Sequence, residues 1–578
     1  MAQIEIKDFD FSYIDEEGKA KKCLKNINLE VEEGDFILLC GPSGCGKTTL
    51  LSNLKKELIP NGEKSGTIKY DGTEISNLDE LTSACDIGYL FQNPDSQLVM
   101  DTVIQEIAFP LENIGLPTDE IRNRVSEIVT FFGINDILHK NVNELSGGQK
   151  QLVNLCSLLT LRPKVLLLDE PTSQLDPIAT HDFISILNRL NEEFSISIIL
   201  SEHKADHVFS SINRLVFMKD GTIEYSGNPY EIAKESFSDE TFIHYLPSVS
   251  RLYNLLSKKY PILNEIEVPL TIREGRKCLN LIHDQLMKMK DNGINLENDY
   301  GNMDVDKEKP YVIKADGLYF AYEKHNLVLK NINLEIYEND YISIIGGNGS
   351  GKSTLLELMA GLLDPIKGKI KYKKGLKIGF VYQNPMIHFS KDTVKEELIS
   401  SINIPDEYRE QLMELDDYDL ITDNELNEIT YDNSSLNFEK LINLFGIGNL
   451  LSRNPYDCSG GEQQKIVIMK TMLQDTDILI LDEPTKALDP ISSLKLAKIF
   501  EEIRKDGMTI VMTSHDLPFV ANNCERCLML FDKDIQIDTF PKAIFRENNF
   551  YTTFINRMVK NYCPKCVTIP DVRKKWDL

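Results

Sequence analysis

Two glycine-rich octets in the sequence have the residue types and spacing that bind phosphate. Both fit the pattern G-x-x-x-x-G-K-[ST], and each follows a short apolar run and precedes a helical pattern. In such a loop the glycines let successive backbone N–H groups surround phosphate oxygens, and the start of the following helix adds its dipole. The lysine would reach the β- and γ-phosphates, and the last hydroxyl would ligate Mg²⁺. The octets are Gly41-Pro42-Ser43-Gly44-Cys45-Gly46-Lys47-Thr48 and Gly346-Gly347-Asn348-Gly349-Ser350-Gly351-Lys352-Ser353.

Two acidic pairs have the carboxylates that metal binding and water activation need. Asp169-Glu170 and Asp482-Glu483 each end an apolar run, and a carboxylate at the end of a buried strand is costly unless a positive charge offsets its burial. We expect the aspartates to hold Mg²⁺ through its water shell and the glutamates to orient and polarise an attacking water. The alternative, an Asp-Glu pair that only makes a turn, is disfavoured because the pair occurs twice in the same context.

These motifs belong to a duplication of a whole domain. Leu145-Ser146-Gly147-Gly148-Gln149 returns as Cys458-Ser459-Gly460-Gly461-Glu462, between the octet and the acidic pair in both copies. From the serine of this motif to the aspartate of the acidic pair the spacing is 23 residues in both copies. The second copy is longer before this motif because of an Asp- and Glu-rich segment near 407–439. The repeat therefore has the length of a domain and not of a short solenoid unit.

The elements that position these motifs are predicted to be strands of a parallel sheet. Continuous apolar runs are typical of strands that are buried on both faces. Since helical patterns follow the octets, each copy is predicted to have an α/β fold. Between the copies, residues 284–310 are charged, Asn-rich and weakly periodic, which predicts a linker. The apolar runs lie at 36–40, 165–168, 196–200 and 341–345.

The composition indicates a globular protein and argues against several classes. A chain of 578 residues is too long for one hydrophobic core. The net charge of −27 disfavours a nucleic-acid partner, because such binding needs Lys and Arg to neutralise phosphates. No run of about 18 uncharged apolar residues could span a bilayer, and residues 1–10 lack the apolar core of a secretion signal. The eleven scattered cysteines fit a reducing compartment better than a disulfide framework.

The order of these motifs resembles that of the ATP-binding-cassette (ABC) ATPases, over nearly all of residues 3–235 and 311–545. The Ser-Gly-Gly signature is the most specific element, because other phosphate-loop enzymes lack it. The resemblance implies ATP hydrolysis with Mg²⁺ in two P-loop NTPase domains, each a RecA-like α/β core with a helical subdomain and an antiparallel β subdomain. The predicted boundaries are 1–235 for the first nucleotide-binding domain, 236–310 for an extension and linker, 311–545 for the second domain with an acidic insertion near 400–440, and 546–578 for a C-terminal tail.

The resemblance also assigns roles to residues outside the octets. Gln92 and Gln383 would be the Q-loop glutamines, which contact Mg²⁺ and pass motion to a partner, and His203 and His515 the histidines that contact the γ-phosphate. The catalytic set is then Glu170, Glu483, His203 and His515, and the metal-binding set is Thr48, Gln92, Asp169, Ser353, Gln383 and Asp482. Further nucleotide-binding positions are Thr49, Thr354, the D-loop aspartates Asp176 and Asp489, and Tyr13 and Tyr322, which would stack on adenine or else pack in the core.

In that family the signature contacts the nucleotide held by the opposite copy, in a head-to-tail arrangement. One site would combine the first octet with Ser459, Gly460, Gly461 and Glu462, and the other would combine the second octet with Ser146, Gly147, Gly148 and Gln149. Since neither glutamate nor histidine is lost, two competent sites are predicted. The second signature departs from the first at Cys458 and Glu462. Because Glu462 adds a negative charge near a triphosphate, the two sites are predicted to be unequal.

The first Q-loop has a tail that points to one group of transporters. Phe91-Gln92-Asn93-Pro94-Asp95-Ser96-Gln97-Leu98 resembles the ATPase subunits of energy-coupling-factor importers of vitamins and transition metals, and Glu202-His203 also fits that group. The second copy begins alike with Tyr382-Gln383-Asn384-Pro385 and departs at Met386-Ile387-His388-Phe389. The resemblance implies a peripheral motor subunit at the cytoplasmic face of the cell membrane. Its partners would be a coupling transmembrane protein and a separate membrane component that binds the solute, with no nucleic acid.

Several alternatives stay open from the sequence. The main one is a soluble tandem cassette that acts on ribosomes or nucleic acid, which the net charge and the non-basic linker disfavour. A regulator without turnover is disfavoured because both glutamates are present. Cys524-x-x-Cys527 and Cys563-x-x-Cys566 together would suit a four-thiolate zinc site, but the first pair aligns with apolar Ile212 and Leu215, which predicts core thiols. For the acidic insertion, a solvated surface is expected over a docking element.

Overall fold

The computed structural model divides the chain into two compact units, Met1–Ile282 and His283–Leu578. Most of the predicted linker and most of the predicted acidic insertion lie outside the described residues. The structure describes residues 3–14, 18–203, 206–291, 310–323, 326–402, 409, 413, 438–486, 488–549 and 551–578.

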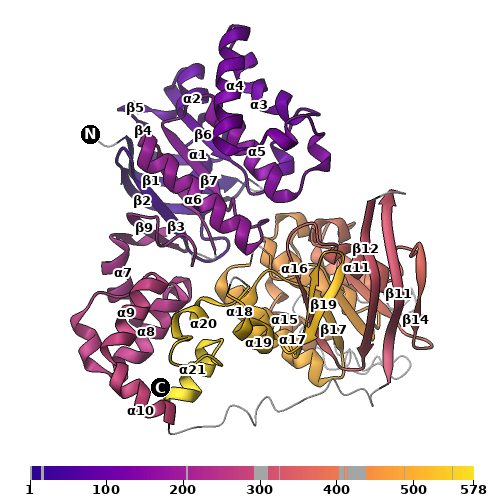
Figure 1. Cartoon of the computed structure of the whole chain (residues 1–578). Coiled ribbons are helices and arrows are strands. Elements are labelled where there is room, and N and C mark those ends of the chain that lie inside the picture. The colour runs from indigo at the N-terminus through magenta and orange to yellow at the C-terminus, as the bar shows by residue number, and fades with distance from the viewer. Residues whose placement is uncertain are drawn as a thin grey trace. The chain divides into compact units, whose positions relative to one another are not determined.

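The first unit contains two sheets that share a core (Figure 1). An antiparallel sheet has the order β2-β1-β4-β5, and a six-stranded sheet has the order β10-β9-β3-β8-β7-β6. Within the larger sheet β6, β7, β8, β3 and β9 pair in parallel, and β10 adds an antiparallel edge. The strands are β1 (Ile4–Ile14), β2 (Ala20–Val31), β3 (Phe36–Cys40), β4 (Glu63–Tyr70), β5 (Thr73–Glu74), β6 (Ile87–Leu90), β7 (Val165–Asp169), β8 (Ser197–Ser201), β9 (Arg214–Lys219) and β10 (Thr222–Gly227).

The second unit repeats this topology. Its six-stranded sheet has the order β15-β16-β17-β13-β18-β19, which matches the first unit strand for strand, and its antiparallel sheet has the order β12-β11-β14. The predicted duplication and the α/β fold class are therefore confirmed. The strands are β11 (Tyr311–Glu323), β12 (Asn326–Tyr337), β13 (Tyr341–Ile345), β14 (Lys367–Tyr372), β15 (Ile378–Val381), β16 (Ile478–Leu481), β17 (Thr509–Thr513), β18 (Arg526–Phe531) and β19 (Asp534–Thr539).

Three helices in each unit form a subdomain that begins after the Q-loop. In the first unit α3 (Val103–Asn113), α4 (Thr118–Phe132) and α5 (Gly147–Thr160) bury their apolar faces in one cluster. Their counterparts are α12 (Val394–Ser401), α15 (Phe438–Phe445) and α16 (Gly460–Met472). The other helices are α1 (Lys47–Asn53), α2 (Glu80–Asp86), α6 (Pro177–Phe194), α7 (Pro229–Glu235), α8 (Ser248–Lys259), α9 (Ile272–Leu281), α10 (His283–Asp291), α11 (Lys352–Met359), α17 (Pro490–Lys505), α18 (Leu517–Asn523), α19 (Pro541–Glu547), α20 (Phe554–Val559) and α21 (Ile569–Trp576).

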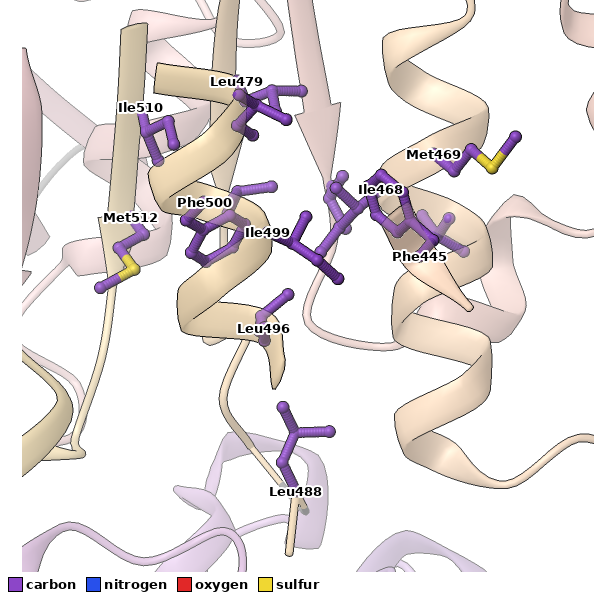
Figure 2. Close-up of a cluster of buried hydrophobic side chains, with 14 of the residues drawn as sticks. Phe445, Ile468, Met469, Leu479, Leu488, Leu496, Ile499, Phe500, Ile510 and Met512 are labelled. Atoms are coloured by element: carbon purple, nitrogen blue, oxygen red, sulfur yellow. The ribbon is translucent and has the colours of Figure 1, made fainter. Parts of the chain in front are cut away.

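One apolar core of the second unit joins its sheet to its helical subdomain. Figure 2 shows Phe500 of α17 beside Met512 of β17, with Phe445 of α15 and Ile468 of α16 further along the same cluster. All four side chains are fully or almost fully buried. Because cores are packed as densely as organic crystals, this contact makes the helical subdomain follow the sheet on which the acidic pair sits.

The residues that follow each copy of the repeat fold onto that copy's own unit. In the first unit α8 and α9 follow α7, so residues 236–282 form helices of that unit. In the second unit α20 and α21 follow α19, and Trp576 is buried at the end of the C-terminal segment. No helix among the residues that the structure describes is both long and apolar enough to cross a bilayer.

Candidate nucleotide sites

Each glycine-rich octet forms a loop between a buried strand and a helix. Gly46 and Gly351 precede α1 and α11 with φ of +103° and +99°, a left-handed conformation that favours glycine. A Cβ at Gly46 would lie 2.7 Å from a methyl group of Leu24, so this position has no room for a side chain. Both loops therefore make the left-handed turn into a helix that a glycine at this position allows.

The lysine of each octet lies inside its own loop. The Lys47 ammonium donates to the carbonyl oxygens of Gly41 at 2.8 Å and Pro42 at 3.3 Å. Lys352 donates to the Gly346 and Gly347 carbonyls at 3.1 Å each. These side chains are buried, so each positive charge is held inside its own loop.

A cavity of ≈ 360 Å³ in the second unit collects the predicted site residues. Residues of the octet line this cavity. Among the described residues, none of the signature residues Ser459 to Glu462 lines it. Tyr322 lines the cavity, is 64% exposed, and its hydroxyl lies 3.1 Å from Thr354 Oγ1. Tyr13 lies likewise 3.0 Å from Thr49 Oγ1 and is 39% exposed. Both tyrosines are thus partly exposed beside the helix that follows their octet, and neither is in the core. The lining residues are Tyr322, Val328, Asn348, Gly349, Gly351, Lys352, Ser353, Thr354, Gln383, Asp482, Glu483 and His515.

The aspartate of each acidic pair contacts the last hydroxyl of its octet. Asp169 accepts a hydrogen bond from Thr48, and Asp482 accepts one from Ser353. Burial raises the pKa of both carboxyls; the neighbouring Glu170 raises it further at Asp169, whereas the hydrogen bond from Thr513 opposes the rise at Asp482. A carboxylate and a hydroxyl are the oxygen donors that Mg²⁺ prefers, and a cation would offset the buried negative charge. The donor sets of both units therefore fit Mg²⁺, with phosphate oxygens completing the coordination.

In the first unit two side chains hold the glutamate of the acidic pair. Gln92 Nε2 donates to Glu170 Oε2 at 2.6 Å, and His203 Nε2 lies 2.6 Å from Glu170 Oε1. Glu170 is buried and has φ of +45°, a strained backbone conformation for a residue other than glycine. Both carboxylate oxygens are thus fixed by groups that the sequence places far apart.

The second unit repeats the backbone conformation of the glutamate but not its side-chain contacts. Glu483 has φ of +50°, and its Oε2 accepts from the backbone N–H of His515 at 3.1 Å. His515 Nε2 lies 3.4 Å from Glu483 Oε1, compared with 2.6 Å for the equivalent pair in the first unit. His515 is also the more exposed of the two histidines. The two sites are therefore alike in backbone and unequal in side-chain contacts.

Two hydroxyl residues and one buried glutamate belong to these sites although the sequence analysis did not single them out as site residues. The β7–β8 register pairs Asp169 with Ser201, whose hydroxyl donates to Asp169 Oδ1 at 2.7 Å. Thr513 does the same for Asp482 at 2.6 Å. Each hydroxyl also accepts from the backbone N–H of the neighbouring glutamate. The sequence signal for these contacts was a hydroxyl residue, Ser201 or Thr513, at the end of the same buried strand in both copies.

Glu202 is the buried residue that precedes His203 of the first site. It is 3% exposed, and its Oε1 accepts from both the N–H and the hydroxyl of Thr172, at 3.0 and 2.6 Å. Burial raises the pKa of Glu202 to about 8, and the charge of Glu170 adds to the rise. Ser514 takes this place in the second unit and bonds Thr485. The first site therefore has an additional titratable group that the second lacks.

The signature residues form helix caps in the helical subdomains. Ser146 and Gln149 make a reciprocal capping box at the start of α5, and Ser459 and Glu462 make one at the start of α16. The Ser459 hydroxyl also donates to Glu462 Oε2 at 3.0 Å. The D-loop aspartates Asp176 and Asp489 cap α6 and α17. Glu462 occupies in the second signature the position that Gln149 has in the first. The two signatures therefore share the same helix cap and differ in charge.

The cysteine expectations are confirmed in part. Cys527 is buried in β18 and Cys524 packs against the same core, as expected for core thiols. Cys563 and Cys566, in contrast, form a disulfide, so this pair departs from the expectation that the cysteines fit a reducing compartment. The turn between α20 and α21 brings the two sulfurs together and leaves no thiolate for zinc. In the described ranges, no group of three or more His, Cys, Asp and Glu side chains could hold a metal ion.

The chain is similar to known proteins over nearly its whole length. A family model described as "ABC transporter" matches residues 24–173 and 329–486. A Bacillus cereus protein named "Putative ABC transporter ATP-binding protein" is 41% identical over 586 residues, covering 99% of this chain and 98% of the relative. The structure of cbiO1 from Clostridium perfringens, described as part of the ABC transporter complex cbiONQ, is 32% identical with a TM-score of 0.38 and covers 46% of this chain and 99% of that chain. A chain in the complex of archaeal ribosomal stalk protein aP1 and archaeal ribosome recycling factor aABCE1 shares the fold over 90% of this chain and 87% of its own length, with a TM-score of 0.53 and 21% identity.

Proposed function

The chain belongs to the family of ABC transporter ATP-binding proteins, and from this premise we propose that it is the motor subunit of an energy-coupling-factor importer for a vitamin or a transition-metal ion. It is an ABC ATPase with two cassettes. The observation that supports turnover most directly is the Glu170 carboxylate, which Gln92 and His203 hold through its two oxygens.

In the proposed reaction the chain's own groups bind ATP, orient water and hold a proton. Lys47 and the loop amides would bind the phosphates, with Tyr13 against the adenine. Glu170 would accept a hydrogen bond from the attacking water and hold its proton, while His203 keeps the carboxylate in place. Mg²⁺, when held by Thr48 and Asp169, would neutralise developing phosphate charge. The second cassette would use Lys352, Tyr322, Glu483, His515, Ser353 and Asp482 in the same roles.

Each site is proposed to be completed by the signature of the other cassette, as the family resemblance implies. Ser459 to Glu462 would serve the first octet and Ser146 to Gln149 the second. Such an arrangement explains why the cavity of the second unit is lined without its own signature. A duplicated chain supplies both halves at high effective concentration.

The first Q-loop tail supports the importer proposal. Pro94 and Asp95 begin a short 3₁₀ helix at Pro94–Ser96, which is tied to α5 by the Lys150–Asp95 ion pair at 2.6 Å and by Asn154 Nδ2 donating to the Pro94 carbonyl at 3.0 Å. The tail thus forms one body with the helical subdomain. A partner that binds this surface would move together with the Q-loop. Gln92 of the Q-loop contacts Glu170, so this motion would reach the proposed catalytic carboxylate. We place that partner in the membrane, with the chain peripheral on its cytoplasmic face.

Co-purification tests the proposal. The chain would carry an affinity tag, be extracted from membranes with detergent, and be analysed for accompanying proteins by mass spectrometry. The proposal predicts integral membrane proteins at near-stoichiometric amounts. A chain with Asp95→Lys serves as the matched control. The change replaces the Lys150–Asp95 ion pair with two positive charges, so less of the membrane proteins should be recovered with this variant. Recovery of ribosomes instead of membrane proteins would overturn the importer proposal in favour of a soluble cassette that acts on ribosomes.

A further inference from the structure

A side chain in each Q-loop tail ties the end of the loop back to its beginning. Gln97 Oε1 accepts from the backbone N–H of Phe91 at 3.2 Å, and Gln97 Nε2 donates to the Tyr89 carbonyl at 3.2 Å. In the second unit His388 occupies the same place, and its Nε2 accepts from the N–H of Tyr382 at 3.1 Å. Phe91 and Tyr382 immediately precede the Q-loop glutamines. Both side chains therefore accept a hydrogen bond from the residue before the Q-loop glutamine, one through an amide oxygen and the other through an imidazole nitrogen.

The surroundings of the two braces differ in charge. In both units a buried glutamate on the first subdomain helix, Glu106 or Glu397, accepts from two backbone N–H groups of the tail. In the second unit Lys470 of α16 also binds Glu397 and donates to the His388 carbonyl. The equivalent position in the first unit is Ser157, a neutral residue. The charged pair thus accompanies the histidine and is absent where the brace is Gln97.

A histidine serves as a hydrogen-bond acceptor only while that nitrogen carries no proton. Nε2 of His388 faces an N–H donor, so the neutral ring must carry its proton on Nδ1. Protonation of Nε2 would place two donors against each other and break the brace. An amide side chain such as Gln97 does not titrate and accepts at every pH.

The charged and titratable groups that face His388 come from three elements. Lys470 lies on α16, Glu397 on α12, and the Tyr382 ring, whose centroid is 5.6 Å from that of His388, follows β15. Burial and the Lys470 charge lower the pKa of His388, whereas Glu397 opposes this effect. The neutral ring is therefore favoured near neutral pH, and the brace is lost only on acidification.

We infer that Gln97 and His388 are positioning residues for the two Q-loops, and that His388 makes the second ATP site, but not the first, lose its Q-loop brace when protonated. Gln383, next to the braced Tyr382, lines the cavity with Glu483. Release of the brace would let Gln383 leave this position and slow hydrolysis at that site. The inference rests on the ATPase activity and does not require an importer partner.

The test is a pH profile of ATP hydrolysis by the full chain at saturating ATP, with each rate divided by that protein's own rate near neutral pH. Between about pH 7.5 and about pH 5, the wild type should lose more activity than His388→Gln, which installs the amide of the first unit, by up to about twofold if each site supplies half of the turnover. Gln97→His, which puts a titrating brace in the first unit as well, should lose more activity on acidification than the wild type. His388→Ala, without an acceptor, should be slow across the whole range. Equal normalised profiles for the wild type and His388→Gln would overturn the inference.

Hydrogen–deuterium exchange provides a readout that is independent of turnover. After correction for the intrinsic effect of pH on exchange, the peptide that contains Tyr382 should lose protection on acidification in the wild type and keep it in His388→Gln. The peptide that contains Phe91 should be unaffected in both proteins. Loss of protection in His388→Gln to the same extent as in the wild type would contradict the brace. Because neither experiment involves the membrane, failure here leaves the importer proposal intact, and the reverse also holds.

Discussion

Gln92 Nε2 donates to Glu170 Oε2 at 2.6 Å, so the Q-loop of the first unit is tied to the carboxylate that is proposed to activate water. His203 holds the other oxygen of the same carboxylate at 2.6 Å. Any displacement of the Q-loop therefore acts on Glu170 directly. This contact gives a physical route by which the proposed partner at the Q-loop tail would control hydrolysis.

Gln92→Ala removes that contact without touching the phosphate loop. We expect kcat to fall about ten- to a hundredfold, since misplacing a catalytic group by about an ångström has effects of this size. The affinity for ATP should change much less. Steady-state kinetics and binding of a fluorescent ATP analogue measure the two quantities. Gln92→Glu, which sets a second negative charge against Glu170, should lower kcat further, and an unchanged kcat in both variants would contradict the role of Gln92.

Thr513→Val tests the hydroxyl that joins the acidic pair of the second unit to its neighbouring strand. The change conserves volume but deprives buried Asp482 of its 2.6 Å hydrogen bond. We expect a loss of about 1–3 kcal/mol in the free energy of unfolding, together with reduced turnover. Thr513→Ser keeps the hydroxyl, as Ser201 does in the first unit, and should retain most of both. Similar results for the two variants in urea denaturation would show that the hydroxyl is not the cause.

Glu202→Gln should change how stability depends on pH. In the native protein the pKa of Glu202 is raised from 4.5 to about 8. The stability that its neutral form contributes is therefore complete below about pH 4.5 and is lost as the pH rises through about 8. Glutamine stays neutral, so its advantage over the wild type should grow by a few kcal/mol between about pH 5 and about pH 9, at about 1.4 kcal/mol per pKa unit. Thermal unfolding at several pH values measures this.

A matched control for that prediction is Glu63→Gln, because Glu63 is exposed. Its stability difference from the wild type should be almost constant with pH. Parallel pH curves for the wild type and Glu202→Gln would show that Glu202 is not neutral in the native protein.

Glu462→Gln and Gln149→Glu exchange the charge of the two signatures while both keep their capping boxes. If each signature faces a triphosphate, Glu462→Gln should raise turnover and Gln149→Glu should lower it, each by about two- to tenfold, from the interaction of like charges near the protein surface. The differences should shrink at high ionic strength because salt screens such charges. A charge effect that is insensitive to salt, or of the opposite sign, would contradict the predicted position of Glu462.

The sequence was sufficient for motifs whose residues are adjacent in the chain. The octets, the acidic pairs and the strands that lead into them lie where local patterns predict, because glycine-rich turns and buried apolar strands have strong local signatures. The contacts of Ser201 with Asp169 and of Gln92 with Glu170 were not predictable in this way. They depend on strand register and on loops that meet only in the folded unit.

One expectation failed for a physical reason, and the structure adds helices to a segment that was predicted only as an extension and linker. The Cys563–Cys566 disulfide depends on a turn between two helices, and the spacing of the two cysteines did not distinguish it from a metal site. The segment 236–310 was predicted as an extension and linker, and its first part forms helices of the first unit, α8 and α9. A capping box of Thr271 and Glu274 begins α9, so a local signal for this helix was present in the sequence.

The most direct test of the account is ATP turnover by Glu170→Gln, Glu483→Gln and the double variant, with ATP binding measured in parallel. The account predicts that all three bind ATP, that each single variant loses at least about half of the turnover, and that the double variant loses about a hundredfold or more, because the water then lacks a general base at both sites. Full turnover in either single variant would show that its glutamate is not catalytic, and full turnover in the double variant would contradict the central claim of two ATP-hydrolysing cassettes.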